Sequence, residues 1–436
     1  MAKPRQALFL QLLLGVALLA GLLLTGSWLL RDEEVKPIRV GVLHSLSGTM
    51  SISERPVAAA TLMAIEEINA AGGVNGRPIE PILVDAKSDP VVFGREAARL
   101  IDVNNVSAIF GCWTSASRKQ VKTVVEDRNH LLVYPVQYEG LEESPNIIYL
   151  GAAPSQQIIP AVKWCFDNLG KKAFLVGSDY VFPRTANEII HDVLNSLGGE
   201  IVGEEYLLLG SSEVEPVVDA IIEAEPDVIL NTLNGDSNLA FYEVLRKRGI
   251  SPRQIPSMSF SIAEPELLQL GPAQMAGDYA AWSYFETVQT RANTQFVENF
   301  RIFQSKLFPS LTKALPPPAD RVLSDPMEAA YVGVKMWAGA VEDAQSDAPE
   351  DVLETIVNQS YPAPEGIVCI DMINQHAWKH ARIGRIDSAG QFDIIWQTDR
   401  PVQPIPFPIF RPRSEWEQFL TELRQKWGGW QNPGRE

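Results

Sequence analysis

The sequence predicts an α/β fold with two doubly wound, Rossmann-like lobes joined by a hinge of several chain crossings. Short apolar runs alternate with helical patterns from Ile38 to about Phe260, an alternation typical of parallel sheets. The cycle restarts after Leu150, which indicates a second unit. The chain has 436 residues, 46% of them hydrophobic, and is therefore long enough for two domains with cores of their own.

The N-terminal segment, residues 1–37, has the pattern of a membrane anchor or a secretory signal. Residues 7–30 carry no charge and follow Lys3 and Arg5. A cleaved signal has a core of about 7–15 apolar residues, whereas about 20 residues span a bilayer. The length of the run favours an uncleaved anchor, and the basic residues before it place the body of the protein outside the cytoplasm.

The first unit consists of strands and helices in strict alternation. Strands are predicted at 38–43, 79–84, 107–110, 131–134 and 146–150. Helices are predicted at 58–71, at 91–102 and from a cap at Ser115 or Ser117 to Arg128. The stretch 44–53 between the first strand and the first helix is predicted to be a polar loop.

The second unit repeats the pattern. Strands are predicted at 174–177, 200–207, within DVILNT and at 256–260, and helices at 155–166, 185–197, 214–224 and 239–247. Beyond it, helices at 295–307 and 326–344 precede a hairpin-like stretch, RIGRIDSAGQFDIIWQ. We interpret this order as a return to the first lobe near Thr287 and a further crossing near Pro362.

These crossings predict four parts of the chain. The first lobe comprises 38–153 and 287–361, the second lobe comprises 154–286 and 362–400, and 401–436 is a tail with one amphipathic helix. Several crossings between two lobes form a hinge, and two lobes so joined can close on one ligand.

Polar and aromatic side chains follow the strand ends in both units. In open α/β sheets, ligands bind outside the carboxyl ends of the strands. The first-lobe candidates for ligand contact are Trp113, Thr114, Ser115, Tyr134, Gln137 and Tyr138, and the second-lobe candidates are Tyr180, Phe182, Asn234 and Asp236. Aromatic walls with hydrogen-bonding groups suit a small, polar, uncharged guest.

Other classes of function lack support in the sequence. A net charge of −17 and a pI near 4.9 disfavour a nucleic-acid partner. The three cysteines show no metal-ligand spacing, and His376 and His380 lie between strand-like stretches without a helical pattern, so no metal site is expected. Nucleophile-elbow, HExxH and dinucleotide motifs are missing from the sequence. We expect a binding protein with no catalytic residues and no cofactor.

Several motifs in combination resemble one family. They are IRVGVLHSLSGTMSISE, INAAGGVNGRPIEPILVDAKSDP, GCWTSASRK, YPVQYEGLEESPNIIYLGAAPSQQ, VGSDYVFPRTAN and LNTLNGDSN. The chain resembles periplasmic substrate-binding proteins of the type I fold, in the urea and short-chain amide receptor subfamily of ABC transporters. The resemblance implies a periplasmic location and permease partners. It also implies that the family's amide pocket is formed here by Trp113, Ser115, Tyr134, Gln137, Tyr180 and Phe182.

Three functions remain open from the sequence. The first is a urea or short-amide receptor. A Gln137 side chain offers both a carbonyl and an NH₂ to a ureido group, which favours urea over acetamide as its ligand. A branched-chain amino acid receptor would need a pocket charge for the ammonium group, for which Asp236 or Glu139 are available. A membrane-anchored amide sensor would use the same pocket together with a signalling partner.

Overall fold

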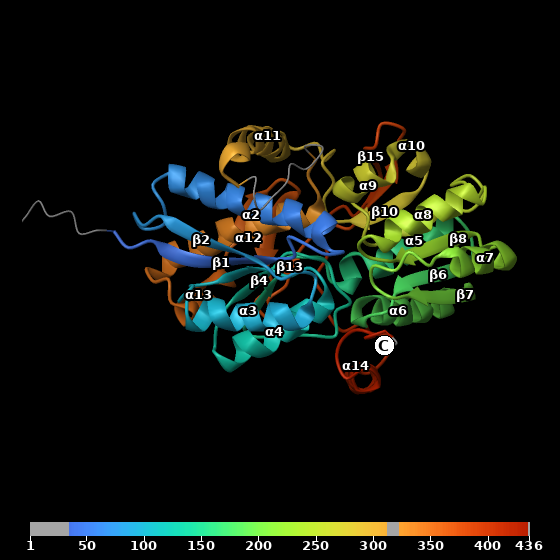
Figure 1. Cartoon of the computed structure of the whole chain (residues 1–436), viewed down its shortest axis with the longest axis horizontal. Coiled ribbons are helices and arrows are strands. Elements are labelled where there is room, and N and C mark those ends of the chain that lie inside the picture. Colours follow the sequence, from blue (N-terminus) through green and yellow to red (C-terminus); the bar gives the residue numbers. More distant parts are fainter. Residues whose placement is uncertain (1–34, 312–321, 435–436) are drawn as a thin grey trace, which may run out of the picture.

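The computed structural model describes residues 35–311 and 322–434. Two α/β lobes lie side by side, as Figure 1 shows, and the chain passes between them more than once. The expected anchor at residues 7–30 lies outside the described residues. Within the described part of the chain, no helix is both long and apolar enough to cross a membrane.

The first lobe is built on a five-stranded parallel sheet. Its strand order is β2-β1-β3-β4-β5. The strands are β1 (Ile38–His44), β2 (Ile79–Asp85), β3 (Ile109–Gly111), β4 (Leu132–Tyr134) and β5 (Ile147–Tyr149). The helices of this lobe are α2 (Ser51–Ala70), α3 (Pro90–Asp102), α4 (Ser115–Asp127), α11 (Arg291–Leu311), α12 (Asp325–Ala344) and α13 (Pro349–Ile356).

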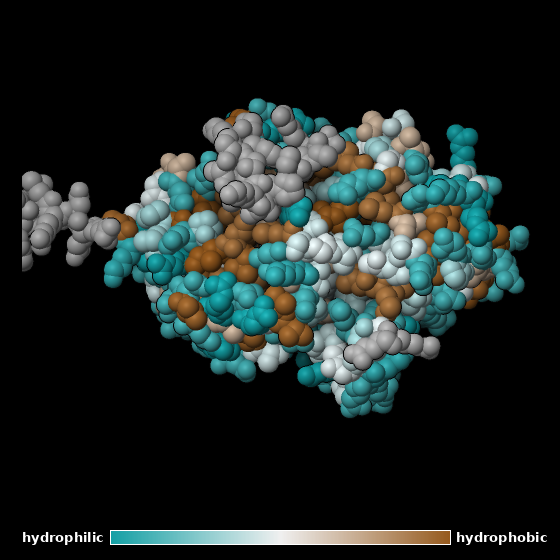
Figure 2. All heavy atoms as spheres, viewed as in Figure 1, coloured by the Kyte–Doolittle hydropathy of each residue, from teal (hydrophilic) through white to brown (hydrophobic). Residues whose placement is uncertain are grey.

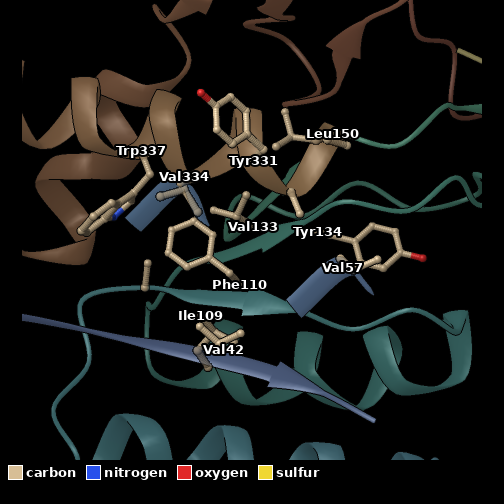
Figure 3. Close-up of a cluster of buried hydrophobic side chains, with 14 of the residues drawn as sticks. Val42, Val57, Ile109, Phe110, Val133, Tyr134, Leu150, Tyr331, Val334 and Trp337 are labelled. Atoms are coloured by element: carbon tan, nitrogen blue, oxygen red, sulfur yellow. The ribbon is translucent and has the colours of Figure 1, made fainter. Parts of the chain in front are cut away.

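The core of the first lobe lies between this sheet and α12. Figure 3 shows Phe110 and Val133 of the sheet pointing toward Val334 and Trp337 of α12. The rings of Phe110 and Trp337 pack edge to face with centroids 5.7 Å apart. Such an arrangement stabilises by about 0.5–1.5 kcal/mol beyond the burial of apolar area.

The second lobe has a seven-stranded sheet in the order β15-β14-β10-β9-β8-β6-β7. The strands are β6 (Lys172–Ser178), β7 (Glu200–Leu207), β8 (Val228–Thr232), β9 (Ser257–Ser259), β10 (Tyr279–Trp282), β14 (Arg382–Ile386) and β15 (Phe392–Gln397). The helices are η1 (Pro154–Gln156), α5 (Ile158–Asn168), α6 (Val181–Leu197), α7 (Glu215–Ala224), α8 (Ser237–Lys247), α9 (Glu264–Leu270) and α10 (Pro272–Met275). The antiparallel pairing of β14 with β15 confirms the predicted hairpin.

The last crossing between the lobes comes later than the predicted position near Pro362. A small antiparallel sheet of β11 (Ser360–Ala363), β12 (Gly366–Ile370) and β13 (Ala377–Trp378) follows α13. Its inward residues belong to the first core, because Val368, Ile370 and Ala377 pack there. The chain therefore leaves the first lobe only between β13 and β14.

Buried charges hold the crossings together. Lys379, in the last crossing, lies 2.8 Å from Glu365 and 3.8 Å from both Asp325 and Glu328. Arg382 donates to the carbonyls of Glu365 and Ser283, the latter in the crossing that follows β10. Removing one partner from such a buried group is strongly destabilising, because it leaves the remaining charges uncompensated.

Several helix starts differ from the sequence prediction, those of α2, α4 and α6 near the strand ends among them. Helix α2 begins at Ser51 inside the expected loop, and α6 begins at Val181, four residues early. Pro183 fits there because a proline in the first helical turn removes an N–H that has no partner in the helix. The cap of α4 is Thr114, whose hydroxyl accepts from the amide of Ser117 at 3.1 Å.

The C-terminal tail carries the predicted helix, α14 (Arg413–Trp427), which packs beside α6. Figure 1 shows it below the body of the molecule, near the start of α6. Trp416, Leu420 and Leu423 are buried, whereas the outward side is hydrophilic, as Figure 2 shows. Helix α14 is therefore an amphipathic helix that covers one side of the second lobe.

Candidate functional site

The two sheet edges face each other, and side chains from both lobes meet between them. Trp113 of the first lobe donates its indole N–H to Asn234 Oδ1 of the second at 3.4 Å. Gln137 Nε2 donates to the carbonyl of Phe260 at 2.8 Å. We call this region the interlobe site. It lies at the carboxyl ends of β3, β4, β8 and β9, where parallel sheets place their ligands.

After β3, the chain reaches this site at a point where its backbone passes close to that of β1. A Cβ on Gly111 would lie 2.0 Å from the carbonyl oxygen of Leu43, so only glycine fits there. Cys112 then adopts the left-handed region with φ of 68°, which turns the chain away from the sheet. This turn presents Trp113 to the opposite lobe and starts α4 at Thr114.

Ser115 lies in a buried ionic cluster. Its hydroxyl donates to Glu139 and accepts from Arg118 at 3.0 Å. Arg118 also donates to Glu139 at 3.2 Å and to Glu142 at 2.9 Å, and Lys119 contacts Glu142 at 2.8 Å. The hydroxyl of Ser115 is therefore held by first-lobe partners in this closed arrangement.

The charges of this cluster stabilise one another against burial. Burial alone would raise the pKa of Glu142, but the charges of Arg118 and Lys119 outweigh burial and lower that pKa well below its usual range. Arg118 lies over the rings of Tyr138 and Tyr134, at 4.4 and 4.9 Å from their centroids. The guanidinium is thus occupied by carboxylates, a hydroxyl and aromatic faces.

The first-lobe tyrosines extend from the site into the core. Tyr134 donates to the carbonyl of Trp113 at 2.6 Å, which fixes the turn after β3. Tyr138 donates to the carbonyl of Glu142 at 3.1 Å and also contacts His376 Nε2. His376 stacks on Tyr149 at 4.2 Å, and burial lowers its pKa to about 4. The structure therefore places Tyr138 in a buried stack behind the site.

Two glutamine side chains converge on one carbonyl between the lobes. Gln157, which follows the first crossing, donates to the Phe260 carbonyl at 3.3 Å and to the Ala281 carbonyl at 2.6 Å. Gln137 donates to the same Phe260 carbonyl. The Oε1 atoms of both glutamines are buried and have no hydrogen-bond partner among the described residues. Two buried acceptors without donors suit a guest that carries N–H groups.

The second-lobe candidates lie at two helix starts. Tyr180 is the N-cap residue of α6, and its ring centroid lies 6.3 Å from that of Phe182. Burial raises the pKa of the Tyr180 phenol, and the nearby Tyr134 and Glu139 of the first lobe raise it further. Tyr180 and Phe182 are both buried, and they belong to a buried cluster that also contains Ala116 and Leu141 of the first lobe.

Asn234 and Asp236 lie around a glycine at the contact between the lobes. The backbone amide of Asp236 donates to Thr49 Oγ1 at 3.2 Å, and Asp236 itself is exposed at the rim of the interlobe site. Gly235 has φ of 63°, and a Cβ there would approach Thr49 Oγ1 to 2.8 Å. The structure thus brings Asn234 into the interlobe site and leaves Asp236 at its edge.

Several residues of this interface were missed by sequence reasoning. They are Ser53, Gln157, Phe260 and Glu266. Ser53 donates to Glu266 across the lobes at 2.5 Å. A signal for Gln157 existed in its position directly after the first crossing, whereas Glu266 lies on α9, a short helix that the sequence pattern did not reveal.

The histidines and cysteines are placed apart from one another. His380 Nδ1 faces the carbonyl of Thr398 at 3.1 Å, while His376 lies in the tyrosine stack. No group of three or more metal-ligating side chains occurs within residues 35–311 and 322–434. Cys112, Cys165 and Cys369 are free thiols, the first two buried.

Comparison with known proteins gives one long match and several partial ones. Residues 38–413 match the model of a family described as periplasmic binding protein domain. A protein named limonene hydroxylase from Geobacillus stearothermophilus is 28% identical over 137 residues, 31% of this chain and 23% of that protein. Leu/Ile/Val-binding protein homolog 7 of Brucella abortus is 38% identical over 89 residues, 20% of this chain and 22% of its own. The chain thus spans about a quarter of the length of the curated relatives it matches.

Solved structures share the fold over most of the chain. A solute-binding protein of an ABC transporter from R. palustris, in complex with 4-hydroxybenzoate, superposes with a TM-score of 0.73. The similarity covers 84% of this chain and 98% of that one, at 20% sequence identity. At this identity the likeness shows the fold, an α/β arrangement of two lobes.

Proposed function

This chain belongs to the periplasmic binding protein family, and on that premise we propose that it is an extracytoplasmic solute-binding protein that captures urea or a short-chain amide between its lobes and delivers it to an ABC transporter. The observation that carries the ligand class is the pair of buried, unpartnered amide oxygens on Gln137 and Gln157. Each needs an N–H donor when the lobes are closed, and a ureido or amide guest supplies two or more.

The charges around the site support a neutral guest. A carboxylate ligand would need a free cation, but the guanidinium of Arg118 is occupied by Glu139 and Glu142. An ammonium group would need a free carboxylate, but Glu139 is held by Arg118 and Ser115, and Asp236 is exposed at the rim. Burying an unpaired charge costs far more than burying a hydrogen-bonded neutral group.

The names of two similar proteins support a second candidate function. One is named a Leu/Ile/Val-binding protein, and a solved neighbour holds 4-hydroxybenzoate. Both ligands carry a carboxylate, so they would require the ionic cluster around Arg118 to rearrange. A branched-chain amino acid receptor is therefore our alternative, and an amide sensor at the membrane would use the same pocket.

Titration calorimetry with a panel of solutes tests this proposal. Purified protein without residues 1–34 is titrated with urea, acetamide, formamide, leucine and 4-hydroxybenzoate. We expect saturable binding of urea or a short amide without turnover, and no heat from the two carboxylates. Binding of leucine or 4-hydroxybenzoate, with none of the neutral solutes, would contradict the proposal.

A further inference from the structure

We propose that residues 430–432 of the C-terminal tail form a clasp that holds the loop of Tyr180 and Phe182 in place and links it to the first lobe. The clasp would set how long the two lobes stay closed on a guest. Its effect on ligand release rests on the proposed function, because it assumes that Tyr180 and Phe182 contact the guest. Its structural role stands independently on the contacts described next.

The clasp pairs with the loop through main-chain and side-chain hydrogen bonds. The amide of Val181 donates to the carbonyl of Trp430 at 2.9 Å, and the amide of Asn432 donates to the carbonyl of Asp179 at 3.0 Å. Tyr180 and Gln431 lie opposite each other in an antiparallel bridge. The side-chain amide of Asn432 also donates to the Asp179 carboxylate at 2.5 Å.

The start of α6 depends on this pairing. The first N–H groups of a helix have no partner within the helix and require a cap. Tyr180 is the N-cap residue, but its side chain makes no capping hydrogen bond. The carbonyl of Trp430 accepts from Val181, the first residue of the helix, and so supplies a partner that the local sequence lacks.

The clasp also contacts the first lobe. The Lys119 ammonium lies 4.8 Å from the centroid of the Trp430 ring, and Arg424 of α14 lies 5.2 Å from it. Lys119 belongs to α4 and pairs with Glu142 in the ionic cluster behind the site. One indole ring therefore connects the Tyr180 loop to α4, the helix that follows Trp113.

The rest of the tail is fixed to both lobes. Arg413 pairs with Glu143 of the first lobe at 2.9 Å, and Arg411 pairs with Asp192 on α6 at 2.7 Å. A hollow of about 360 Å³ lies between α4 and the tail. The tail contacts the second lobe through the main-chain hydrogen bonds of residues 430–432. It contacts the first lobe through the Arg413 ion pair, the Trp430 ring contact and a hydrogen bond from the amide of Leu141 to the carbonyl of Pro406 at 2.8 Å. The contact between the Trp430 ring and Lys119 joins the clasp to the first lobe, and opening of the lobes would break it.

Hydrogen exchange in the full chain without ligand tests the structural role. The variants are Trp430→Ala and Asn432→Asp, the second of which sets a carboxylate against that of Asp179. Gln425→Ala, at an exposed position of α14, is the control. Asn432→Asp loses the side-chain hydrogen bond to Asp179, and Trp430→Ala loses the ring that holds residue 430 against Lys119 and Arg424. Exchange at the start of α6 should therefore be about fivefold faster or more in both variants, but not in the control. Unchanged exchange at Val181 would overturn the clasp.

Urea release tests the link to the site. Stopped-flow dissociation of urea is compared for the wild type, Trp430→Ala and Trp430→Phe, which keeps an aromatic ring beside Lys119. We expect release about fivefold faster in Trp430→Ala and close to the wild-type rate in Trp430→Phe. Faster exchange with unchanged urea release would overturn the role in closure. If the wild type does not bind urea, the proposed function fails, while the exchange result still decides the clasp.

Discussion

Gln137 and Gln157 set the polarity of the interlobe site at the scale of single residues. Both side chains use their NH₂ groups on second-lobe carbonyls and leave a buried oxygen without a partner among the described residues. An unmatched buried acceptor costs about 1–3 kcal/mol. A guest that donates to these oxygens regains that free energy on binding, which selects for N–H groups.

Replacing Gln137 by alanine should weaken the binding of urea or a short amide by about 1–3 kcal/mol, because the guest would lose a buried acceptor. Calorimetric titration of Gln137→Ala measures the loss. The exposed Gln425→Ala serves as the matched control. Wild-type affinity in a Gln137→Ala protein that melts normally would remove this residue from the site.

His376 makes the stability of the first lobe depend on pH. Burial lowers its pKa to about 4 in the folded state, against about 6.5 in an unfolded chain. Between those values the unfolded state binds more protons, so the free energy of unfolding falls as pH drops from 6.5 to 4, by about 3 kcal/mol at most from this group.

The variant His376→Phe keeps a ring against Tyr149 but cannot be protonated. Denaturant unfolding at several pH values should therefore show a smaller loss of stability between pH 6.5 and 4 in the variant than in the wild type. Tyr138 still donates to the Glu142 carbonyl in this variant. Equal losses in the two proteins would show that His376 is not held neutral.

The partners of individual residues were the least predictable part of the site. The positions of Trp113, Ser115 and Gln137 after strand ends could be read from the sequence. The contact of Ser115 with Glu139 could not be read from the sequence. The buried cluster around Arg118 is made by tertiary contacts between residues that lie 21 and 24 positions apart along the chain.

At the scale of elements, the loop between β6 and α6 carries the second-lobe half of the site. Tyr180 should act mainly after the first encounter, because it belongs to a buried cluster with Ala116 and Leu141 of the first lobe, and closure of the lobes would form that contact. Tyr180→Ala should therefore raise the dissociation rate more than it lowers the association rate. Burial of an aromatic side chain contributes about 1.5–3 kcal/mol to binding. Its loss therefore corresponds to ligand release that is roughly tenfold to a hundredfold faster.

Stopped-flow binding of the Tyr180→Ala protein beside its melting curve separates this role from simple packing. If Tyr180 only fills space beneath the loop, the variant melts early and releases ligand at the wild-type rate. That result would exclude contact between Tyr180 and the guest.

Most elements of the strand–helix alternation were predicted from the sequence, the three-residue strands β3, β4, β5 and β9 among them, whereas several short elements outside it were not. The strand β7 and the hairpin of β14 and β15 follow clear apolar patterns. The strands β11 to β13, with 2–5 residues each, and the short helices α9 and α10 carry too few residues for a period to appear. Glu266 was missed for this reason.

At the scale of the whole molecule, lobe closure is held by a few polar contacts between the lobes. Ser53 donates to Glu266, Thr49 accepts from the amide of Asp236, and Trp113 donates to Asn234. Each contact is made only when the lobes are closed, so each favours the closed state by a small amount. A guest that adds donors for Gln137 and Gln157 shifts the population further in that direction.

The two-lobed architecture followed from the alternation of strands and helices, but the place of the last crossing did not. The sequence around Pro362 has the same extended pattern whichever lobe it joins. The packing of Val368 and Ala377 in the first core assigns this stretch to the first lobe, and these tertiary contacts cannot be read from the sequence.

Small-angle scattering with and without saturating urea tests the central claim, that a small neutral amide is bound between two closing lobes. Without ligand we expect a larger radius of gyration than the closed structure has, and with urea a decrease toward the closed value. Leucine added at the same concentration should leave the radius unchanged. A radius that does not respond to urea, or one that falls only with leucine, would contradict the account.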